Sequence, residues 1–324
     1  MNRRHLLSAV FVLAALAALS SLPANASAEG TFQRTLKVNG ATDIDVATGS
    51  GSITVRAGNG DTVEITGHIR VSSWLGNPEE KVHQLENNPP IQQSGNSIRI
   101  GHIPDTDLRR NVSISYELVV PAQTSLKSHS GSGSQRVDGI QGPLDISSGS
   151  GGLRISNIGA EVRADTGSGS IEFERIKGNV RARAGSGSIR GMGIGGGFDA
   201  NTGSGDVTLE QAAPGPVRVE TGSGGVELKG VRGSLEARAG SGGIRAEGDP
   251  TGGWIVHTGS GSIHLRLPAE AAFDLNARTS SGSISLDHPV TVQGNLGRKE
   301  IRGKVRGGGV AVDVETGSGN IEIL

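Results

Sequence analysis

Residues 162–174 read Val-Arg-Ala-Asp-Thr-Gly-Ser-Gly-Ser-Ile-Glu-Phe-Glu, which is two short alternating segments joined by a glycine-rich turn. Alternation of apolar and polar residues with a period of two indicates a β-strand with one buried and one exposed face. Glycine tolerates the positive φ of tight corners, and serine is small enough for turns that stack on one another. The stretch therefore predicts a strand, a tight turn and a second strand.

The same unit recurs along most of the chain. Complete Gly-Ser-Gly copies begin, at intervals of 18 or 19 residues, at Gly131, Gly149, Gly167, Gly185, Gly203, Gly222, Gly240 and Gly259. An outlying copy begins at Gly49, a degenerate copy occupies residues 280–282, and a last complete copy begins at Gly317. A period near 18 is too short for a propeller blade and favours one coil of a β-solenoid. We expect an all-β, right-handed parallel β-helix or β-solenoid with ~18-residue coils, because parallel crossovers are nearly always right-handed.

Stacked coils place equivalent residues in columns, and this can be checked in the sequence. The first column after the turn is apolar throughout: Leu153, Ile171, Ile189, Val207, Val226, Ile244, Ile263, Ile284 and Ile321. A second predicted core column leads to the turn: Val162, Val180, Phe198, Val217, Leu235, Trp254, Phe273 and Val312. In the outward columns that contain Arg154 and Asp165, opposite charges often follow one another. Such pairs stabilise stacked strands by roughly 0.2–1 kcal/mol each, so we interpret most surface charges as part of the stacking.

Composition excludes several classes of protein. The 324 residues include 53 Gly but no Cys, and only eight aromatic side chains, from five Phe, two Trp and one Tyr. No Gly-X-Y triplet runs through the chain, which excludes collagen, and the regular apolar alternation argues against disorder. Few large side chains are present for a conventional enzyme core. The 31 basic and 32 acidic residues nearly balance, so nothing overall favours nucleic acid as a partner.

The first residues read as an export signal. Arg3 and Arg4 precede an apolar run from Leu6 to Leu19, and small residues follow as far as Ala28. We expect residues 1–28 to be a signal peptide cleaved near Ala28, with cleavage after Ala26 as the second choice. The mature chain then has no integral membrane segment, and we expect it to be periplasmic or secreted from a bacterium.

Two regions follow the predicted signal. Residues 29–125 form a less regular β region with one short helix, which we expect to begin with Asn77 as its cap and to end before Pro89-Pro90. Residues 126–324 form the Gly-Ser-Gly repeat solenoid. A basic segment between Arg298 and Arg306 is expected to be a solvated loop. The chain ends inside a complete repeat, so we expect an open edge and edge-to-edge self-association at the C-terminal coil.

Residues with catalytic or binding chemistry are scattered. Glu172 and Glu174 share a strand face, as a glycoside hydrolase would need, but both belong to repeat columns. Asp206 alone offers the carboxylate that a calcium-binding turn would repeat. The histidines have no metal-ligand spacing, and Trp74 is expected to pack against the short helix. We therefore expect no catalytic residues, no metal site and no cofactor.

Three features of the sequence resemble a known family. They are Tyr-Glu-Leu-Val-Val-Pro at 116–121, the repeated Ser-Gly-Ser turns, and Val-Asp-Val-Glu-Thr-Gly-Ser-Gly-Asn-Ile-Glu-Ile at 312–323. The family is the bacterial putative-adhesin domain family of unknown function, related to the head domains of auto-transporter adhesins. The resemblance implies an exported β-solenoid without established catalytic residues. We expect a non-enzymatic adhesin or envelope scaffold whose partner is a polysaccharide or an envelope protein. The alternatives are a β-helix carbohydrate-active enzyme, either a lyase or a hydrolase, and an envelope-stress accessory protein acting through a protein partner.

Overall fold

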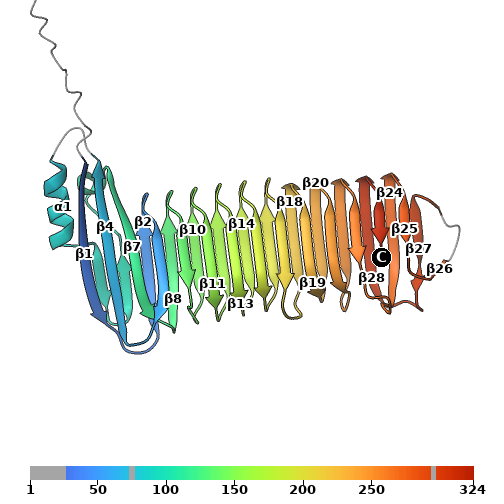
Figure 1. Ribbon diagram of the computed structural model, residues 1–324, viewed down its shortest axis with the longest axis horizontal. Helices are drawn as coiled ribbons and strands as arrows, with labels where there is room; N and C mark the ends of the chain where they lie inside the picture. Colours follow the sequence, from blue (N-terminus) through green and yellow to red (C-terminus); the bar gives the residue numbers. More distant parts are fainter. Residues whose placement is uncertain (1–26, 73–76, 293–296) are drawn as a thin grey trace, which may run out of the picture.

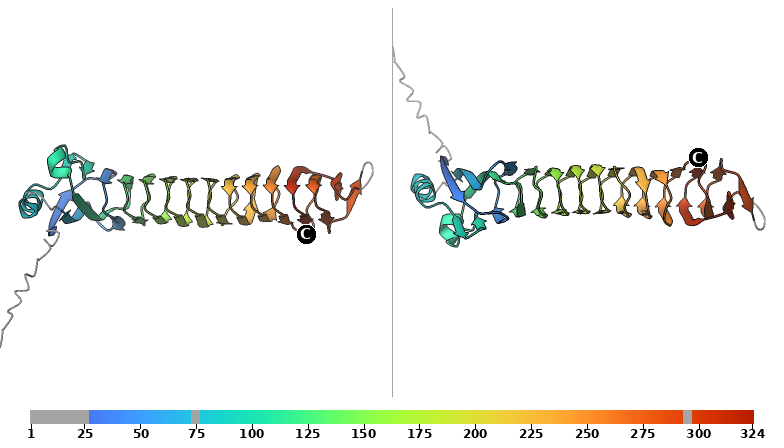
Figure 2. Two further views of the ribbon diagram at one scale, coloured as in Figure 1. Left: turned by 90° about the horizontal axis from the view of Figure 1, so that it is seen from above. Right: turned by 90° about the horizontal axis from the view of Figure 1, so that it is seen from below.

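A computed structural model describes residues 27–72, 77–292 and 297–324 of the chain, and in this part the fold is almost entirely β. Two sheets, A with 14 strands and B with 15, face each other along an elongated stack (Figures 1 and 2). Through the middle of the stack, successive strands alternate between the two sheets, so each coil contributes one strand to each. Residues 1–26 of the predicted signal, 1–28, lie outside the described part, and residues 27 and 28 begin β1.

Sheet A has the spatial order β1 (Ser27–Lys37), β4 (Thr62–Ser72), β7 (Val112–Pro121), β3 (Ile53–Gly58), β9 (Gln135–Asp138), β11 (Leu153–Ile158), β13 (Ile171–Ile176), β15 (Ile189–Ile194), β17 (Val207–Gln211), β19 (Val226–Arg232), β21 (Ile244–Asp249), β23 (Ile263–Arg266), β29 (Ile321–Ile323) and β25 (Ile284–Leu286). Sheet B has the order β26 (Val290–Val292), β27 (Glu300–Val305), β24 (Phe273–Ser281), β28 (Val310–Ser318), β22 (Trp254–Ser260), β20 (Leu235–Ser241), β18 (Val217–Ser223), β16 (Phe198–Thr202), β14 (Val180–Ala184), β12 (Val162–Thr166), β10 (Leu144–Ser148), β8 (Thr124–Ser130), β2 (Thr42–Thr48), β6 (Ser97–Ile100) and β5 (Ile91–Ser94).

The predicted core columns are confirmed in the regular part of the stack. Ile171, Ile189 and Val207 are parallel neighbours in register, 18 residues apart in sequence, and all three are buried. The column before the turn is correct as far as Trp254, after which it continues through Val312 to Leu275. Phe273 instead faces Val310, because β24 is offset by two residues from the register that we predicted. Ile284 is only half-buried, since β25 lies at the end of sheet A.

The stacking glycines are needed mainly for close packing and less for positive φ. A Cβ on Gly169 would overlap the carbonyl oxygen of Gly151 in the preceding coil, and the same holds for Gly187 above Gly169. Positive φ in this turn occurs later in the chain, at Gly242, for example, where it is +150°. The prediction of a glycine turn is confirmed, but over most coils its physical cause is the approach of two backbones.

A column of buried hydroxyls, which sequence analysis did not single out, joins the coils at the same turn. The Thr202 hydroxyl donates to the carbonyl of Gly187 in the preceding coil at 2.8 Å and accepts from the amide of Gly205 at 3.2 Å. Thr166 makes the equivalent pair of bonds with Gly151 and Gly169. The column therefore couples each turn to its neighbour through polar contacts inside the protein.

At the N-terminal end the stacking order departs from the chain order. β2 and β3 form a coil directly below β8 and β9, so the outlying Gly49 turn stacks against Gly131. The predicted region 29–125 therefore contributes one coil to the stack. β1, β4 and β7 pair antiparallel with one another beyond that coil.

The predicted helix, α1 (Pro78–Asn87), is present with Asn77 at its N-cap position and buries Val82 and Leu85 against β1 and β4. It covers the outer edge of sheet A (Figure 1). A second helix, α2 (Thr106–Arg109), was not predicted, because its four residues have no apolar periodicity. The Asp105 side chain caps it by accepting from the amides of Asp107 and Leu108.

The C-terminal end requires two corrections. β29 pairs with β23 on one side and β25 on the other, so the C-terminal coil is not an open edge. The long interval after residue 282 lets the chain run outward and return between two earlier coils. The basic segment is also not a loop: it forms β27, antiparallel to β24, with Ile301 and Val305 buried. Self-association at this end of the stack would have to use β25 or β26.

Candidate functional site

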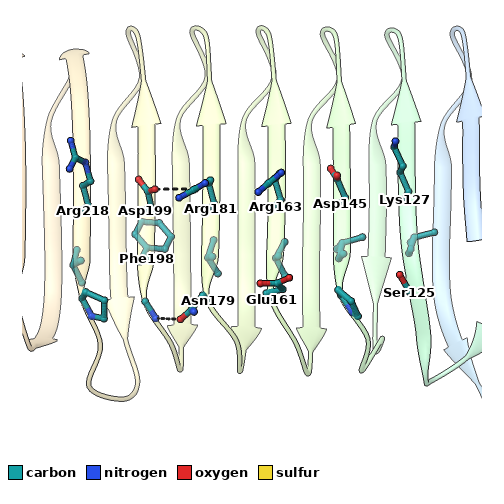
Figure 3. Close-up of a pocket in the computed structure, with 18 of the residues that line it drawn as sticks. Ser125, Lys127, Asp145, Glu161, Arg163, Asn179, Arg181, Phe198, Asp199 and Arg218 are labelled. Atoms are coloured by element: carbon teal, nitrogen blue, oxygen red, sulfur yellow. Dashed lines mark hydrogen bonds and ion pairs between the residues drawn. The ribbon is translucent and has the colours of Figure 1, made fainter. Parts of the chain in front are cut away.

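A long groove with a volume of about 910 Å³ crosses the strands on the outer face of sheet B (Figure 3). Its residues come from the starts of successive sheet B strands, from β6 and β2 through β8 to β22, together with the residue just before most of these strands. Side chains alternate along a strand, so the buried residue at the start of each strand contributes backbone to the floor and its two neighbours form the walls. We call this feature the sheet B groove.

One wall is a row of charged side chains. Neighbouring strands place these residues in register in the order Asp45, Lys127, Asp145, Arg163, Arg181, Asp199, Arg218 and Glu236. The signs alternate along the row except at Arg163 and Arg181, which are adjacent (Figure 3). Like charges stacked at strand spacing repel each other, so this step works against stability.

The arginines of this wall differ in whether they form an ion pair. Arg181 Nε lies 3.1 Å from Asp199 Oδ2, and Arg218 Nη1 lies 3.0 Å from Glu236 Oε2. Arg163 forms no ion pair within the part of the chain that the structure describes. All these side chains are solvent-exposed or nearly so, and such pairs contribute about 0.2–1 kcal/mol. The Arg163 guanidinium is therefore available to a ligand at little cost to the fold.

The opposite wall consists mainly of small side chains. Its row reads Ser125, Pro143, Glu161, Asn179, Gly197, Pro216, Ser234 and Gly253. The Asn179 carboxamide oxygen accepts from the Gly197 amide at 2.8 Å, which fixes that side chain along the row. The groove thus offers closely spaced hydrogen-bond donors on one wall and a low opposite wall that leaves room for a chain-like ligand.

Aromatic stacking is not available in the described part of the molecule. The large apolar side chains exposed there are Met192 and Ile255, and Ile255 lies at the C-terminal end of the groove. Recognition in the groove therefore uses hydrogen bonds, charge and aliphatic contacts in place of aromatic stacking.

The residues singled out from the sequence have structural partners. Glu172 pairs with Arg154 at 2.7 Å on sheet A, and Glu174 pairs with Arg175, so neither lies in the sheet B groove. The Asp206 carboxylate accepts from the Gly225 amide of the next coil at 2.7 Å, which is a structural role. Trp74 lies outside the described residues.

The histidines likewise occupy separate places. Across residues 27–72, 77–292 and 297–324, no group of three or more His, Asp or Glu side chains is arranged to hold a metal ion. Within those ranges, no helix has the length and apolarity of a membrane span.

Sequence analysis did not identify the charged wall. The outward columns on either side of the turn show alternating charge in the sequence, whereas the wall occupies the first outward position of each sheet B strand. The adjacent Arg163 and Arg181, both directly after a core valine, are the sequence signal that was available.

The family of the chain is established by comparison. The model of the Toastrack DUF4097 family matches residues 159–324, slightly more than half of the chain, and the protein belongs to this family. The match confirms the resemblance to a domain family of unknown function. No curated protein matches the chain.

Three solved structures are similar to it at low identity. A "putative cell adhesion protein" from Clostridium sporogenes is 13% identical, covers 91% of this chain and 99% of its own, and has a TM-score of 0.21. A "putative adhesin" from Bacteroides fragilis is 11% identical, with coverages of 91% and 97% and a TM-score of 0.30. A "putative lipid binding protein" from Parabacteroides distasonis is 12% identical, with coverages of 91% and 96% and a TM-score of 0.29. At these scores they carry no argument about this chain.

Proposed function

We propose that the protein is an exported, non-enzymatic β-solenoid of the cell envelope that binds an extended polysaccharide in the sheet B groove. The proposal includes right-handed coils of ~18 residues and a role in adhesion or scaffolding. The observation that carries it is the groove itself, which extends across successive coils and contains an arginine step that does not serve the stacking.

The chemistry of the groove suits a polymer rich in hydroxyl groups. Each sugar hydroxyl both donates and accepts, and the wall presents carboxylates and cations in alternation. A repeating polymer can make the same contact at several coils, so many weak contacts add to a useful affinity. Arg163 is a suitable donor, because no described carboxylate forms an ion pair with it and its neighbour Arg181 carries a like charge.

Binding is tested with the purified mature chain and a panel of neutral and acidic polysaccharides in affinity electrophoresis and calorimetry. Arg163→Gln should weaken binding of the polymer that is retained at least about fivefold, which corresponds to about 1 kcal/mol. The matched control is Arg190→Gln, an exposed arginine at the equivalent strand position on sheet A. Equal loss in both variants, or no retained polymer, refutes the groove as the binding face.

The non-enzymatic part has its own test. The same polysaccharides are incubated with the protein and assayed for new reducing ends and for unsaturated products. Turnover that disappears in Glu161→Gln would make the protein a carbohydrate-active enzyme and would end this proposal.

Export is tested by N-terminal sequencing of the protein recovered from the periplasm or medium. Ala28 is buried and pairs with Val71, and Ser27 pairs with Ser72, so cleavage after Ala26 would keep β1 whole. A mature chain beginning at Ser27 or Glu29 agrees with export. An uncleaved chain found only in the cytoplasm contradicts it.

A further inference from the structure

A second concave site lies at the N-terminal end of the stack and shares no lining residue with the sheet B groove. Its volume is about 980 Å³, close to the upper end of the usual range for small-molecule pockets. Four segments that are distant in sequence converge on it: the turn after β2, the end of β4, the loop from β6 through α2 to β7, and the end of β8. We call it the N-terminal pocket.

The titratable side chains that line this pocket are all basic, Tyr116 aside. They are Arg70, Arg109, His102 and His129, and no carboxylate appears among its described lining residues. Arg70 is paired with Glu29 at 2.8 Å, and His102 lies 3.7 Å from Asp45. Arg109 has no ion pair within the described chain. The pocket therefore contains one uncompensated guanidinium and a surplus of positive charge.

The apolar part of the lining is equally distinct. Ile103, Val112 and Ile114 face the pocket, and Ile103 and Val112 also pack against the core. Hydroxyl groups from Thr48 and Ser113 lie in the same lining. A ligand matching this surface has an apolar body and one polar, negatively charged end.

Tyr116 gives an independent indication of a ligand. Its side chain is 1% exposed, and its hydroxyl has no hydrogen-bond partner among the described residues. Buried polar groups nearly always have a partner, so such a hydroxyl calls for an explanation. It lies at the pocket wall, because a Cβ on Gly101, another lining residue, would come 3.2 Å from it. Burial raises the pKa of Tyr116, which keeps the hydroxyl protonated and able to donate.

We propose that the N-terminal pocket binds a small organic anion that has an apolar body and a carboxylate or phosphate head. Arg109 pairs with the head, the Tyr116 hydroxyl donates to an oxygen of the ligand, and the apolar side chains cover its body. This site is separate from the sheet B groove, so the proposal does not depend on polysaccharide binding.

The test is calorimetric titration of the full mature protein with three probes of equal chain length: octanoate, octyl phosphate and octanol. We expect at least one anion to bind and octanol to bind at least about tenfold more weakly, because a charge-assisted hydrogen bond is lost. Arg109→Gln should weaken anion binding at least about tenfold, and Tyr116→Phe should weaken it about fivefold. Arg190→Gln, an exposed arginine that lines neither site, is the control and should leave anion binding unchanged.

Each outcome decides the proposal. Preference for octanoate or for octyl phosphate supports it and identifies the head group. No binding of either anion at about millimolar concentration, or equal binding of octanol, overturns it. Anion binding that is unchanged in either Arg109→Gln or Tyr116→Phe also overturns it. Circular dichroism of each variant confirms that the fold is intact, and Tyr116→Phe, which removes only the unpartnered hydroxyl, is not expected to unfold the protein.

Discussion

Replacing Thr202 by valine removes one hydroxyl from the buried column while keeping the shape of the side chain. Two hydrogen bonds are lost, one to the carbonyl of Gly187 and one from the amide of Gly205. The side chain is 2% exposed, so water cannot easily replace either partner. A net value of roughly 0.5–1.5 kcal/mol for each bond gives an expected loss of about 2 kcal/mol in the free energy of unfolding.

A matched substitution in the same column should raise the free energy of unfolding. Ala184 occupies the same column between Thr166 and Thr202 and has no hydroxyl to offer. Ala184→Thr should supply the missing bonds, by donating to the carbonyl of Gly169 in the preceding coil and accepting from the amide of Gly187 in its own turn, as Thr202 does with Gly187 and Gly205. We expect it to raise the free energy of unfolding by about 1 kcal/mol, which is less than the Thr202→Val loss because the added side chain must be ordered.

The assay is urea unfolding followed by far-ultraviolet circular dichroism, together with native-state hydrogen exchange. Solenoids do not always unfold in one step, so exchange at the Gly205 amide reports the local effect directly. Protection of that amide should fall in Thr202→Val. If stability stays within about 0.5 kcal/mol of the parent and protection is unchanged, the hydroxyl column does not join the coils as argued.

Three further predictions follow from single contacts. Gly169→Ala should destabilise the protein by more than about 1 kcal/mol in the urea assay, because the added Cβ meets the backbone of the adjacent coil. Its control is Ser168→Ala, at an exposed neighbouring position, which should change the free energy of unfolding by less than about 0.5 kcal/mol. Tyr116→Phe without added ligand should raise stability by about 1 kcal/mol, since it removes a buried unpartnered hydroxyl; a loss would mean that the hydroxyl has a partner. The Lys229 ammonium, hydrogen-bonded to Glu227 at 2.9 Å, holds the pKa of that carboxyl below its usual value, so an NMR titration should show this pKa rise in Lys229→Met. Because the pKa of Glu227 is lower in the folded than in the unfolded protein, its pair with Lys229 contributes to stability at neutral pH. This contribution is lost as the pH falls through the folded-state pKa, and it is small because the pair is exposed to solvent.

The regular coils could be predicted from sequence because each repeats the same physical requirement. Ile171, Ile189 and Val207 fall in one buried column, since only an apolar residue can fill that position in every coil. The glycine turn was predicted for the same reason. Its full cause was not, because the closeness of two stacked backbones is not visible along a single chain.

Structural features that do not recur at a fixed interval along the sequence were not predicted. α2 depends on one capping side chain, Asp105, and the strand β27 depends on Ile301 and Val305 on either side of a glycine. The N-terminal pocket is built from segments that come together only because β2 and β3 stack under β8 and β9. Tyr116 could be recognised as a core residue from its alternating strand, but not as one whose hydroxyl lacks a partner.

Identical repeats do not by themselves determine which coil stacks on which, so something else must select the order at the C-terminal end. If the coils followed the chain, His257 would stand beside Arg278, and Glu315 would lie outside both. In the observed order Glu315 is in register between His257 and Arg278, so a carboxylate separates two basic side chains. On the opposite sheet, His264 Nδ1 lies 2.8 Å from Glu322 Oε2 of the same inserted coil. In both sheets the inserted coil thus places a carboxylate beside a basic side chain. Because the apolar columns repeat in every coil, the outward residues are where this chain differs from one coil to the next and can favour one stacking order.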